Sequence, residues 1–246
     1  MSEWQAVRAA LDAAAERGEA IRFWWRDDDA GRDHPALLRL LTLAEQRGLG
    51  VALAVVPAWL EAEAQALIAG SGVATVLQHG FAHVDHAPPG AKAIELGARS
   101  LPVIEAELEA GRSCLLDAFG ETFLAVLVPP WNRIDDALVG RLAACGFIGL
   151  STFGRRPAPE AAGGLIRVNC HLDPVDWRGS RLFIGHGQAQ AQLLDVLDSD
   201  EPIGLLSHHL VMDEPGWSFL ARLFDLLARH PGARWCSPRE AFASPA

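Results

Sequence analysis

The stretch Val73-Ala74-Thr75-Val76-Leu77-Gln78-His79-Gly80-Phe81-Ala82-His83 is an apolar run that ends in two histidines. An earlier stretch, Ile21-Arg22-Phe23-Trp24-Trp25-Arg26-Asp27-Asp28-Asp29, is built in a similar way and ends in three acids. Runs that are continuously apolar, rather than alternating, are typical of strands buried on both faces of a parallel sheet. Imidazole and carboxylate are the usual ligands of a zinc-like dication, so two such strand ends predict a metal site at one edge of the sheet.

The rest of the chain alternates between apolar strand-like runs and helical patterns, which predicts a parallel sheet covered by helices. Seven or eight such units suit a closed or nearly closed barrel with its functional residues at the carboxyl ends of the strands. An open doubly wound sheet is the alternative, but no Gly-rich phosphate turn follows the first strand. The further strands are expected at 50–56, 123–128, 147–151, 165–170, 203–207 and 233–236. Helices are expected at 3–17, 35–48, 58–69, 92–119 (with breaks at Gly97 and Gly111), 134–145, 188–197 and 216–230.

Composition narrows the class of protein. The 246 residues are half apolar, which suits one domain over residues 1–246. A net charge of −10 without blocks of like charge argues against a nucleic-acid partner. The four cysteines are scattered, as expected of thiols in a reducing compartment. No signal peptide or membrane-spanning stretch is evident, so we expect a cytoplasmic protein with no membrane partner.

The acidic run allows two interpretations. Three acids at a strand end form a solvated turn or a helix cap in many proteins. In an extended strand, however, Arg26 and Asp28 face one side, while Asp27 and Asp29 face the other. One carboxylate is then positioned against the guanidinium while a neighbour binds a cation.

The histidines carry more weight than the acids. His79 and His83 are four residues apart, so their rings converge if the strand runs into a turn of helix. His83 and His86 offer a second pairing, and either Asp85 or Asn132 is positioned in the sequence to orient a ligand ring.

A third group of polar residues follows later strands. His208 comes directly after the run 203–207 and is either a polar strand end or an acid/base residue. Asp176 is either a turn residue or the carboxylate that holds the His208 imidazolium. Trp131 and Trp177 either line a substrate pocket or pack in the core.

Taken together, residues 20–240 resemble the polysaccharide deacetylase family (NodB homology, carbohydrate esterase family four) in five short motifs that occur in the same order. The family's motifs are Thr-Phe-Asp-Asp-Gly, His-(Ser/Thr)-x-x-His, Arg-x-Pro-(Tyr/Phe)-Gly, Asp-x-x-Asp-Trp and Leu-x-His. The matching segments here are Arg26-Asp27-Asp28-Asp29-Ala30, His79-Gly80-Phe81-Ala82-His83, Val128-Pro129-Pro130-Trp131-Asn132, Asp173-Pro174-Val175-Asp176-Trp177 and Leu206-Ser207-His208.

This resemblance implies an irregular (β/α)7-type barrel of parallel strands and a site at its mouth. It implies a divalent metal, with zinc the best fit and iron, cobalt or nickel suited to the same ligands. The metal ligands would be Asp29, His79 and His83. The catalytic group would be Asp28 as base and His208 as acid, with Asp176 and Arg26 beside them. Trp131, Asn132 and Trp177 would contact the substrate.

Two departures from the motifs affect these assignments. Three acids stand where the family has two, so the base and ligand are either Asp28 and Asp29 or Asp27 and Asp28. We favour the first register because it puts Arg26 on the same face as the base. Val128 stands where the family has the arginine that orients the base. We expect Arg26 to replace that arginine, with Arg133 as the alternative.

The expected activity is metal-dependent hydrolysis of a C–N amide bond, with an N-acetylated amino sugar or related carbohydrate as substrate. Without an export signal, a small or nucleotide-linked amino sugar fits better than a polymer. One alternative is a hydrolase of a formamide, ureide or cyclic amide, with a substrate carboxylate bound by Arg155, Arg156 or Arg178. The other alternative is a metal-binding homologue that does not catalyse a reaction.

Overall fold

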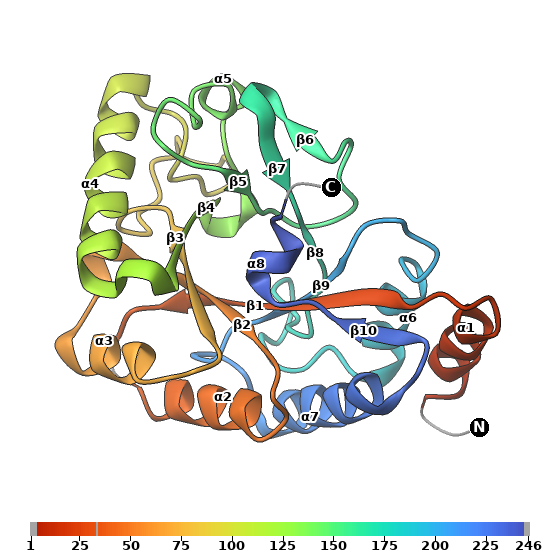
Figure 1. Ribbon diagram of the computed structural model, residues 1–246. Helices are drawn as coiled ribbons and strands as arrows, with labels where there is room; N and C mark the ends of the chain where they lie inside the picture. Colours follow the sequence, from red (N-terminus) through yellow and green to blue (C-terminus); the bar gives the residue numbers. More distant parts are fainter. Residues whose placement is uncertain (1–3, 33, 244–246) are drawn as a thin grey trace.

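The computed structural model describes residues 4–32 and 34–243 as strands with helices packed around them (Figure 1). The strands are β1 (Ile21–Ala30), β2 (Val51–Val55), β3 (Ala74–His79), β4 (Phe123–Val128), β5 (Gly149–Leu150), β6 (Glu160–Ala161), β7 (Leu165–Arg167), β8 (Cys170–Leu172), β9 (Ile203–Ser207) and β10 (Ala233–Trp235). The α-helices are α1 (Gln5–Glu16), α2 (Pro35–Glu45), α3 (Ala62–Ala69), α4 (Leu101–Phe119), α5 (Asp136–Val139), α6 (His186–Leu194), α7 (Glu214–Arg229) and α8 (Pro238–Ala241).

The parallel strands close into a ring. They pair in the order β7-β5-β4-β3-β2-β1-β9-β8. One run of chain, residues 165–172, carries both ends of this series, because β7 pairs with β5 and β8 pairs with β9. A parallel bridge between Phe153 and Cys170 adds to the closure. The predicted irregular (β/α)7-type barrel is therefore confirmed, with β6 and β10 as additions outside the ring.

Alternation along β1 divides its large side chains between two apolar cores. Trp24 lies inside the ring, where its indole packs edge-on against Phe242, with the ring centroids 5.5 Å apart. Trp25 faces the helices and packs against Phe224 of α7, with the ring centroids 4.6 Å apart. Because both faces are buried, the strand needs apolar residues at successive positions, which explains the unbroken apolar runs.

Two helices differ from the sequence prediction by more than their end residues. Residues 92–100 are not helical, and α4 continues through Gly111 without a break. A β-carbon at position 111 would lie 2.5 Å from Nε2 of Gln78, so this glycine lets α4 approach β3 closely. The helix predicted over 134–145 is reduced to α5 followed by turns. Of the helix predicted over 3–17, α1 forms at 5–16, and residue 3 lies outside the described residues.

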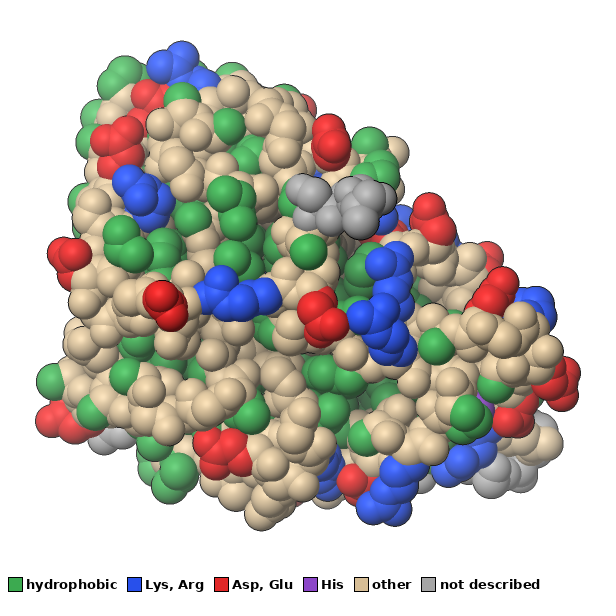
Figure 2. Space-filling model, in the orientation of Figure 1, with side chains coloured by type: hydrophobic (Ala, Val, Ile, Leu, Met, Phe, Trp, Pro, Cys, Tyr) green, Lys and Arg blue, Asp and Glu red, His purple; other side chains and the backbone are tan. Residues whose placement is uncertain are grey.

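One face of the molecule mixes both signs of charge. Figure 2 shows acidic and basic side chains interspersed on the face where α8 lies in front of the strands. Within residues 4–32 and 34–243, no helix combines the length and the apolar character that a membrane crossing requires.

Candidate metal centre

The three acids at the end of β1 point to three different places. Asp27 and Asp28 are almost completely buried and continue the alternation of the strand, with exposed fractions of 0% and 2%. Asp29 has a φ of 69°, in the left-handed region, so the backbone turns and the alternation ends there. As a result Asp29 leaves the face that it would share with Asp27 in a regular strand and faces the histidines instead.

Asp29, His79 and His83 form a compact cluster. Oδ1 of Asp29 lies 3.2 Å from Nε2 of His79 and 3.3 Å from Nε2 of His83. Within the described residues, this is the group of three His, Cys, Asp or Glu side chains whose ligand atoms all lie within 4.8 Å of one another. The structure thus brings together the three residues predicted to hold a metal.

The cluster has the features of a metal site. Oδ1 of Asp29 is buried and takes no hydrogen bond, although it lies beside two ring nitrogens. Ligand atoms bound about 2.0 Å from a tetrahedral zinc are about 3.3 Å from one another, which is close to these two contacts. Nδ1 of His79 lies 2.9 Å from the carbonyl oxygen of Val128, so a proton at Nδ1 leaves a lone pair on Nε2. The residues present therefore fit a divalent metal ion.

The electrostatics of the cluster favour a positive charge at its centre. Burial by itself raises the pKa of Asp29, but close contact with His79 and the charges of His208 and His83 hold it well below its usual range. Burial lowers the pKa of His79, and Asp29 and Asp28 more than offset this and raise it. Burial, followed by the charge of His79, lowers the pKa of His83.

Asp28 is held by Arg26, as predicted from their shared face of β1. Their salt bridge joins Nε to Oδ1 at 2.8 Å, and Nη2 donates to Oδ2 at 2.9 Å. Arg26 is fully buried and also donates to Asn132 Oδ1 at 2.8 Å and to Ser151 Oγ at 2.7 Å. Arg133, the alternative partner, donates instead to the carbonyl oxygen of Ala93. Arg26 thus occupies the position beside Asp28 that we expected for it.

Asp27 belongs to a separate network on the outer face of β1. Its Oδ2 accepts from Ser207 Oγ at 2.5 Å and from the backbone N–H of His209 at 3.1 Å. Its Oδ1 contacts Nδ1 of His209 at very short range. Burial lowers the pKa of His209, but the charge and hydrogen bond of Asp27 outweigh it and raise the pKa. The alternative register, with Asp27 as base and Asp28 as ligand, does not fit this arrangement.

His208 lies between two carboxylates, and one of them differs from the prediction. Its Nε2 is 4.0 Å from Oδ2 of Asp28, and its Nδ1 is 4.0 Å from Oδ1 of Asp173. Asp176, which we predicted to face His208, accepts the backbone N–H groups of Gly179 and Ser180 in its own turn. The prediction for Asp176 is therefore wrong in this structure, because short-range turn bonds use its oxygens. Burial raises the pKa of Asp173, while the charge of His208 acts in the opposite direction.

Aromatic rings surround the cluster. The His83 ring lies 4.4 Å from the Trp131 ring and 5.3 Å from the Trp59 ring, measured between centroids. Trp177 packs edge-on against His208 at 4.7 Å and is 40% exposed. Asn132 is close by, but its side-chain oxygen is occupied by Arg26. Sequence reasoning did not identify Trp59, which lies in a three-residue helical turn, Pro57–Trp59, directly after β2.

Backbone strain gathers at the same place. Six non-glycine residues have positive φ in the described part of the chain, and four of them are at the site: Asp29, His83, Trp131 and Asn132. Each such residue costs about 1–3 kcal/mol unless the surroundings hold it in place, and such residues concentrate at functional sites.

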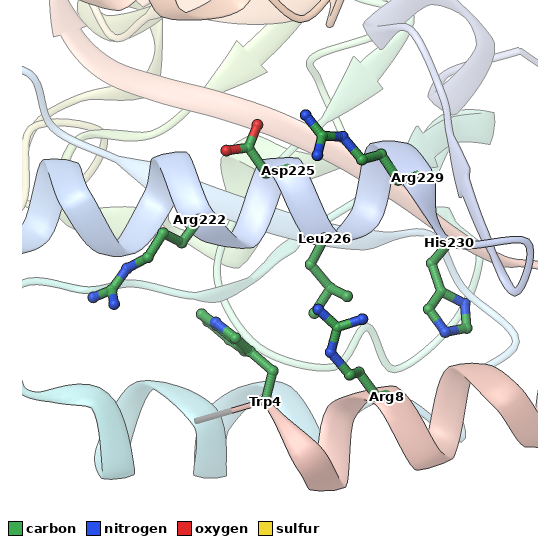
Figure 3. Close-up of a pocket in the computed structure, with 7 residues that line it drawn as sticks. All are labelled: Trp4, Arg8, Arg222, Asp225, Leu226, Arg229 and His230. Atoms are coloured by element: carbon green, nitrogen blue, oxygen red, sulfur yellow. The ribbon is translucent and has the colours of Figure 1, made fainter. Parts of the chain in front are cut away.

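A separate hollow of about 350 Å³ lies between α1 and α7 (Figure 3). Its arginines point in different directions in this view, so they do not converge on one anion. None of its lining residues belongs to the cluster around Asp29. The lining residues are Trp4, Arg8, Arg222, Asp225, Leu226, Arg229 and His230.

No protein-family model and no curated protein matches the sequence. A proposed polysaccharide deacetylase from Mycobacterium smegmatis has a TM-score of 0.69 at 17% identity, over 89% of this chain and 87% of that chain. A family 4 carbohydrate esterase from Streptomyces lividans, in complex with acetate, has a TM-score of 0.58 at 16% identity, over 88% of this chain and 91% of that chain. A family 4 acetyl xylan esterase from Clostridium thermocellum, solved with a cobalt ion, has a TM-score of 0.59 at 16% identity, over 90% of each chain. The chain therefore has the fold of polysaccharide deacetylases and family 4 carbohydrate esterases.

Proposed function

We propose that this protein is a metal-dependent hydrolase that removes the acetyl group from an N-acetylated amino sugar or related carbohydrate. The observation that carries the proposal is the position of Asp29 Oδ1, which lies 3.2 Å and 3.3 Å from the Nε2 atoms of two histidines and takes no hydrogen bond. The fold shared with deacetylases and carbohydrate esterases supports the substrate class.

Asp29, His79 and His83 would hold the metal, which leaves further coordination positions for water and substrate. Zinc suits these ligands best, and iron, cobalt or nickel suit them as well. When bound, such a metal polarises a carbonyl group and lowers the pKa of a bound water molecule.

Asp28 is the general base in this mechanism. It is adjacent in sequence to the metal ligand Asp29, and Arg26 fixes the orientation of its carboxylate through two contacts. Arg26 is itself fixed by Asn132 and Ser151, so the base is held by a buried network rather than by one side chain. A base held in this way accepts a proton from the attacking water without first reorganising.

His208 is the general acid that protonates the leaving amine. Its Nε2 lies 4.0 Å from Oδ2 of Asp28, so the acid and the base are neighbours. Asp173 stands on the far side of the ring, 4.0 Å from Nδ1, where its negative charge stabilises the imidazolium.

Two tryptophans, Trp131 and Trp177, give the site apolar walls for a sugar ring. Trp131 lies on His83 and Trp177 lies on His208, whereas the Trp59 ring is covered by the Arg32 guanidinium, 3.8 Å from its centroid. Flat aromatic surfaces of this kind bind the apolar faces of rings and leave polar groups free to hydrogen-bond.

The test is amine release from N-acetylated amino sugars by protein loaded with zinc or cobalt, with small formamides and ureides as a parallel panel. We expect turnover on an N-acetylated sugar that is lost on chelation and recovered when the metal is restored. Asp28→Asn is expected to lower turnover by about 10²–10⁴-fold while the metal stays bound. Full activity in chelator-treated protein would refute the metal role, and turnover confined to the small amides would refute the substrate class.

A further inference from the structure

A buried carboxylate lies directly under the loop that carries the two histidines. Glu95 is 1% exposed, and its side chain accepts hydrogen bonds from three successive backbone N–H groups. Oε1 accepts from Ala82 at 2.7 Å and from His83 at 2.9 Å, and Oε2 accepts from Phe81 at 3.3 Å. In the described part of the chain, no Lys, Arg or His side chain lies within salt-bridge distance of this carboxylate. Its partners there are the amides of the histidine loop.

The backbone of this loop is shaped for an anion. Gly80 has a φ of 56° and His83 has a φ of 57°, both in the left-handed region. Successive N–H groups in such turns point inward and form a concave anion-binding nest. Here the anion is supplied by the protein itself, and its hydrogen bonds hold His83 in a backbone conformation that a histidine rarely adopts.

The Glu95 carboxylate can approach the histidine loop this closely only because residue 80 is a glycine. A β-carbon there would lie 1.9 Å from Oε2 of Glu95 and 2.7 Å from Cγ of Pro130. The motif that this segment resembles has Ser or Thr at that position. The space that such a side chain would need is filled in this protein by the Glu95 carboxylate.

The position of Glu95 is fixed by the loop that precedes it, which hydrogen bonds close at both ends. Oδ1 of Asp85 accepts from the backbone N–H groups of Ala87 and Ile94, and His86 N donates to the Ile94 carbonyl oxygen. The loop over 85–94 is thus fastened at its base, immediately before Glu95. Leu96 then forms a parallel bridge with Ile134, which fixes the other side of Glu95.

We propose that Glu95 is a positioning residue for the metal site: it fixes the loop that presents His83 and so sets the affinity for the metal. This inference rests on the proposed metal-dependent function, because it assigns Glu95 a role toward the same ion. Glu95 holds the loop through the backbone and does not bind the metal itself.

The experiment uses Glu95→Ala in the full chain and measures two quantities. The first is amide hydrogen exchange at Phe81, Ala82 and His83 in metal-free protein, which we expect to accelerate at least about tenfold as the hydrogen bonds are lost. The second is the dissociation constant for Zn²⁺ and Co²⁺, which we expect to rise about 10–100-fold, as for other residues that orient metal ligands. At saturating metal, turnover should recover most of its wild-type value.

Glu105→Ala is the matched control. Glu105 lies on α4, and its carboxylate is bound by the guanidinium of Arg141, with Nη2 donating to Oε2 at 3.3 Å, and not by the histidine loop. We expect this variant to leave both the exchange at residues 81–83 and the metal affinity unchanged.

Glu95→Gln keeps the test decisive if Glu95→Ala does not fold. The amide oxygen can replace Oε1 for Ala82 and His83, but the NH₂ group cannot accept from Phe81, so faster exchange is expected at Phe81 alone. Unchanged exchange in folded variants, or faster exchange with unchanged metal affinity, would overturn the proposal. A wild-type protein that binds no metal at all would refute the proposed function instead, while the exchange data would still decide whether Glu95 holds the loop.

Discussion

Two contacts between an acid and histidine, built from residues only two apart on β1, differ in how completely the oxygens of the carboxylate are hydrogen-bonded. The side chains of Asp27 and His209 are fully buried. The Asp27 carboxylate accepts hydrogen bonds from Ser207 Oγ and the His209 backbone N–H, and it contacts Nδ1 of the His209 ring. Asp29 is 20% exposed, and its Oδ1 lies between two imidazoles without a hydrogen bond.

The difference shows what separates a structural contact from a candidate site made of the same residue types. A buried polar atom without a hydrogen bond is costly, so a protein keeps one only where something else satisfies it. Asp27 has all its partners within the chain and needs none from outside. Asp29 has an oxygen without a hydrogen bond and is partly exposed to solvent, which is the arrangement expected where a ligand binds.

The largest effect that separates these two contacts is expected from His209→Ala. The variant leaves the buried Asp27 without its imidazole partner, and this should lower the free energy of unfolding by about 3–5 kcal/mol. Denaturant unfolding measures the loss, and cobalt titration of the folded variant should show unchanged affinity. His79→Ala is the matched control, with a smaller loss of stability and no metal binding. If His209→Ala lost metal binding, or if His79→Ala kept it and was the less stable variant, the distinction between a structural contact and a metal site would be contradicted.

A smaller effect is expected at His208, where Asp173 takes the role that we predicted for Asp176. Asp173→Asn should lower turnover about tenfold, which is part of the 10²–10⁴ that a general acid contributes. Asp176→Asn should leave turnover close to wild type, because that carboxylate bonds to its own turn. Steady-state kinetics at saturating metal compares the two variants, and a larger loss in the Asp176 variant would restore the interpretation from sequence.

The smallest effect is a pH dependence of stability that comes from the sealed contact. Burial lowers the pKa of His209, but Asp27 raises it above the value in the unfolded chain. The contribution of protonated His209 is therefore complete below about pH 6.5, the pKa of a free histidine, and is lost as pH rises through the folded pKa. The difference in free energy of unfolding between wild type and His209→Gln, measured by denaturant unfolding, should therefore become smaller as the pH rises above about 6.5. A difference that grows with pH would show that the sign of the shift is wrong.

The fold could be predicted because its signals are local. Continuous apolar runs indicate strands buried on both faces, and polar residues at the carboxyl ends of β1, β3 and β9 indicate one functional edge. Gly111 misled the helix prediction because a glycine that allows close packing and a glycine that ends a helix look alike in sequence. The length of α5 was overestimated because residues 140–146 form turns despite a helix-compatible composition.

The site could be predicted only where strand geometry carries the information. Alternation along β1 is sufficient to place Arg26 beside Asp28. It fails at Asp29, whose positive φ ends the alternation and turns the carboxylate to the histidines. Asp173 and Asp176 are both plausible partners for His208 by spacing. Both accept short-range bonds, and only the structure shows that Asp173 is the one that lies 4.0 Å from the His208 ring. Glu95 lies in a segment without regular secondary structure, so nothing local connects it to the histidines.

The most direct test of the account is a cobalt titration followed by visible absorption, with wild type, Asp29→Ala and Asp27→Asn measured side by side. We predict one cobalt ion per chain in the wild type, the same stoichiometry in the Asp27 variant and loss of the site in the Asp29 variant. Equal binding by the wild type and the Asp29 variant, or no stoichiometric binding by the wild type, would contradict a shared ion between Asp29, His79 and His83.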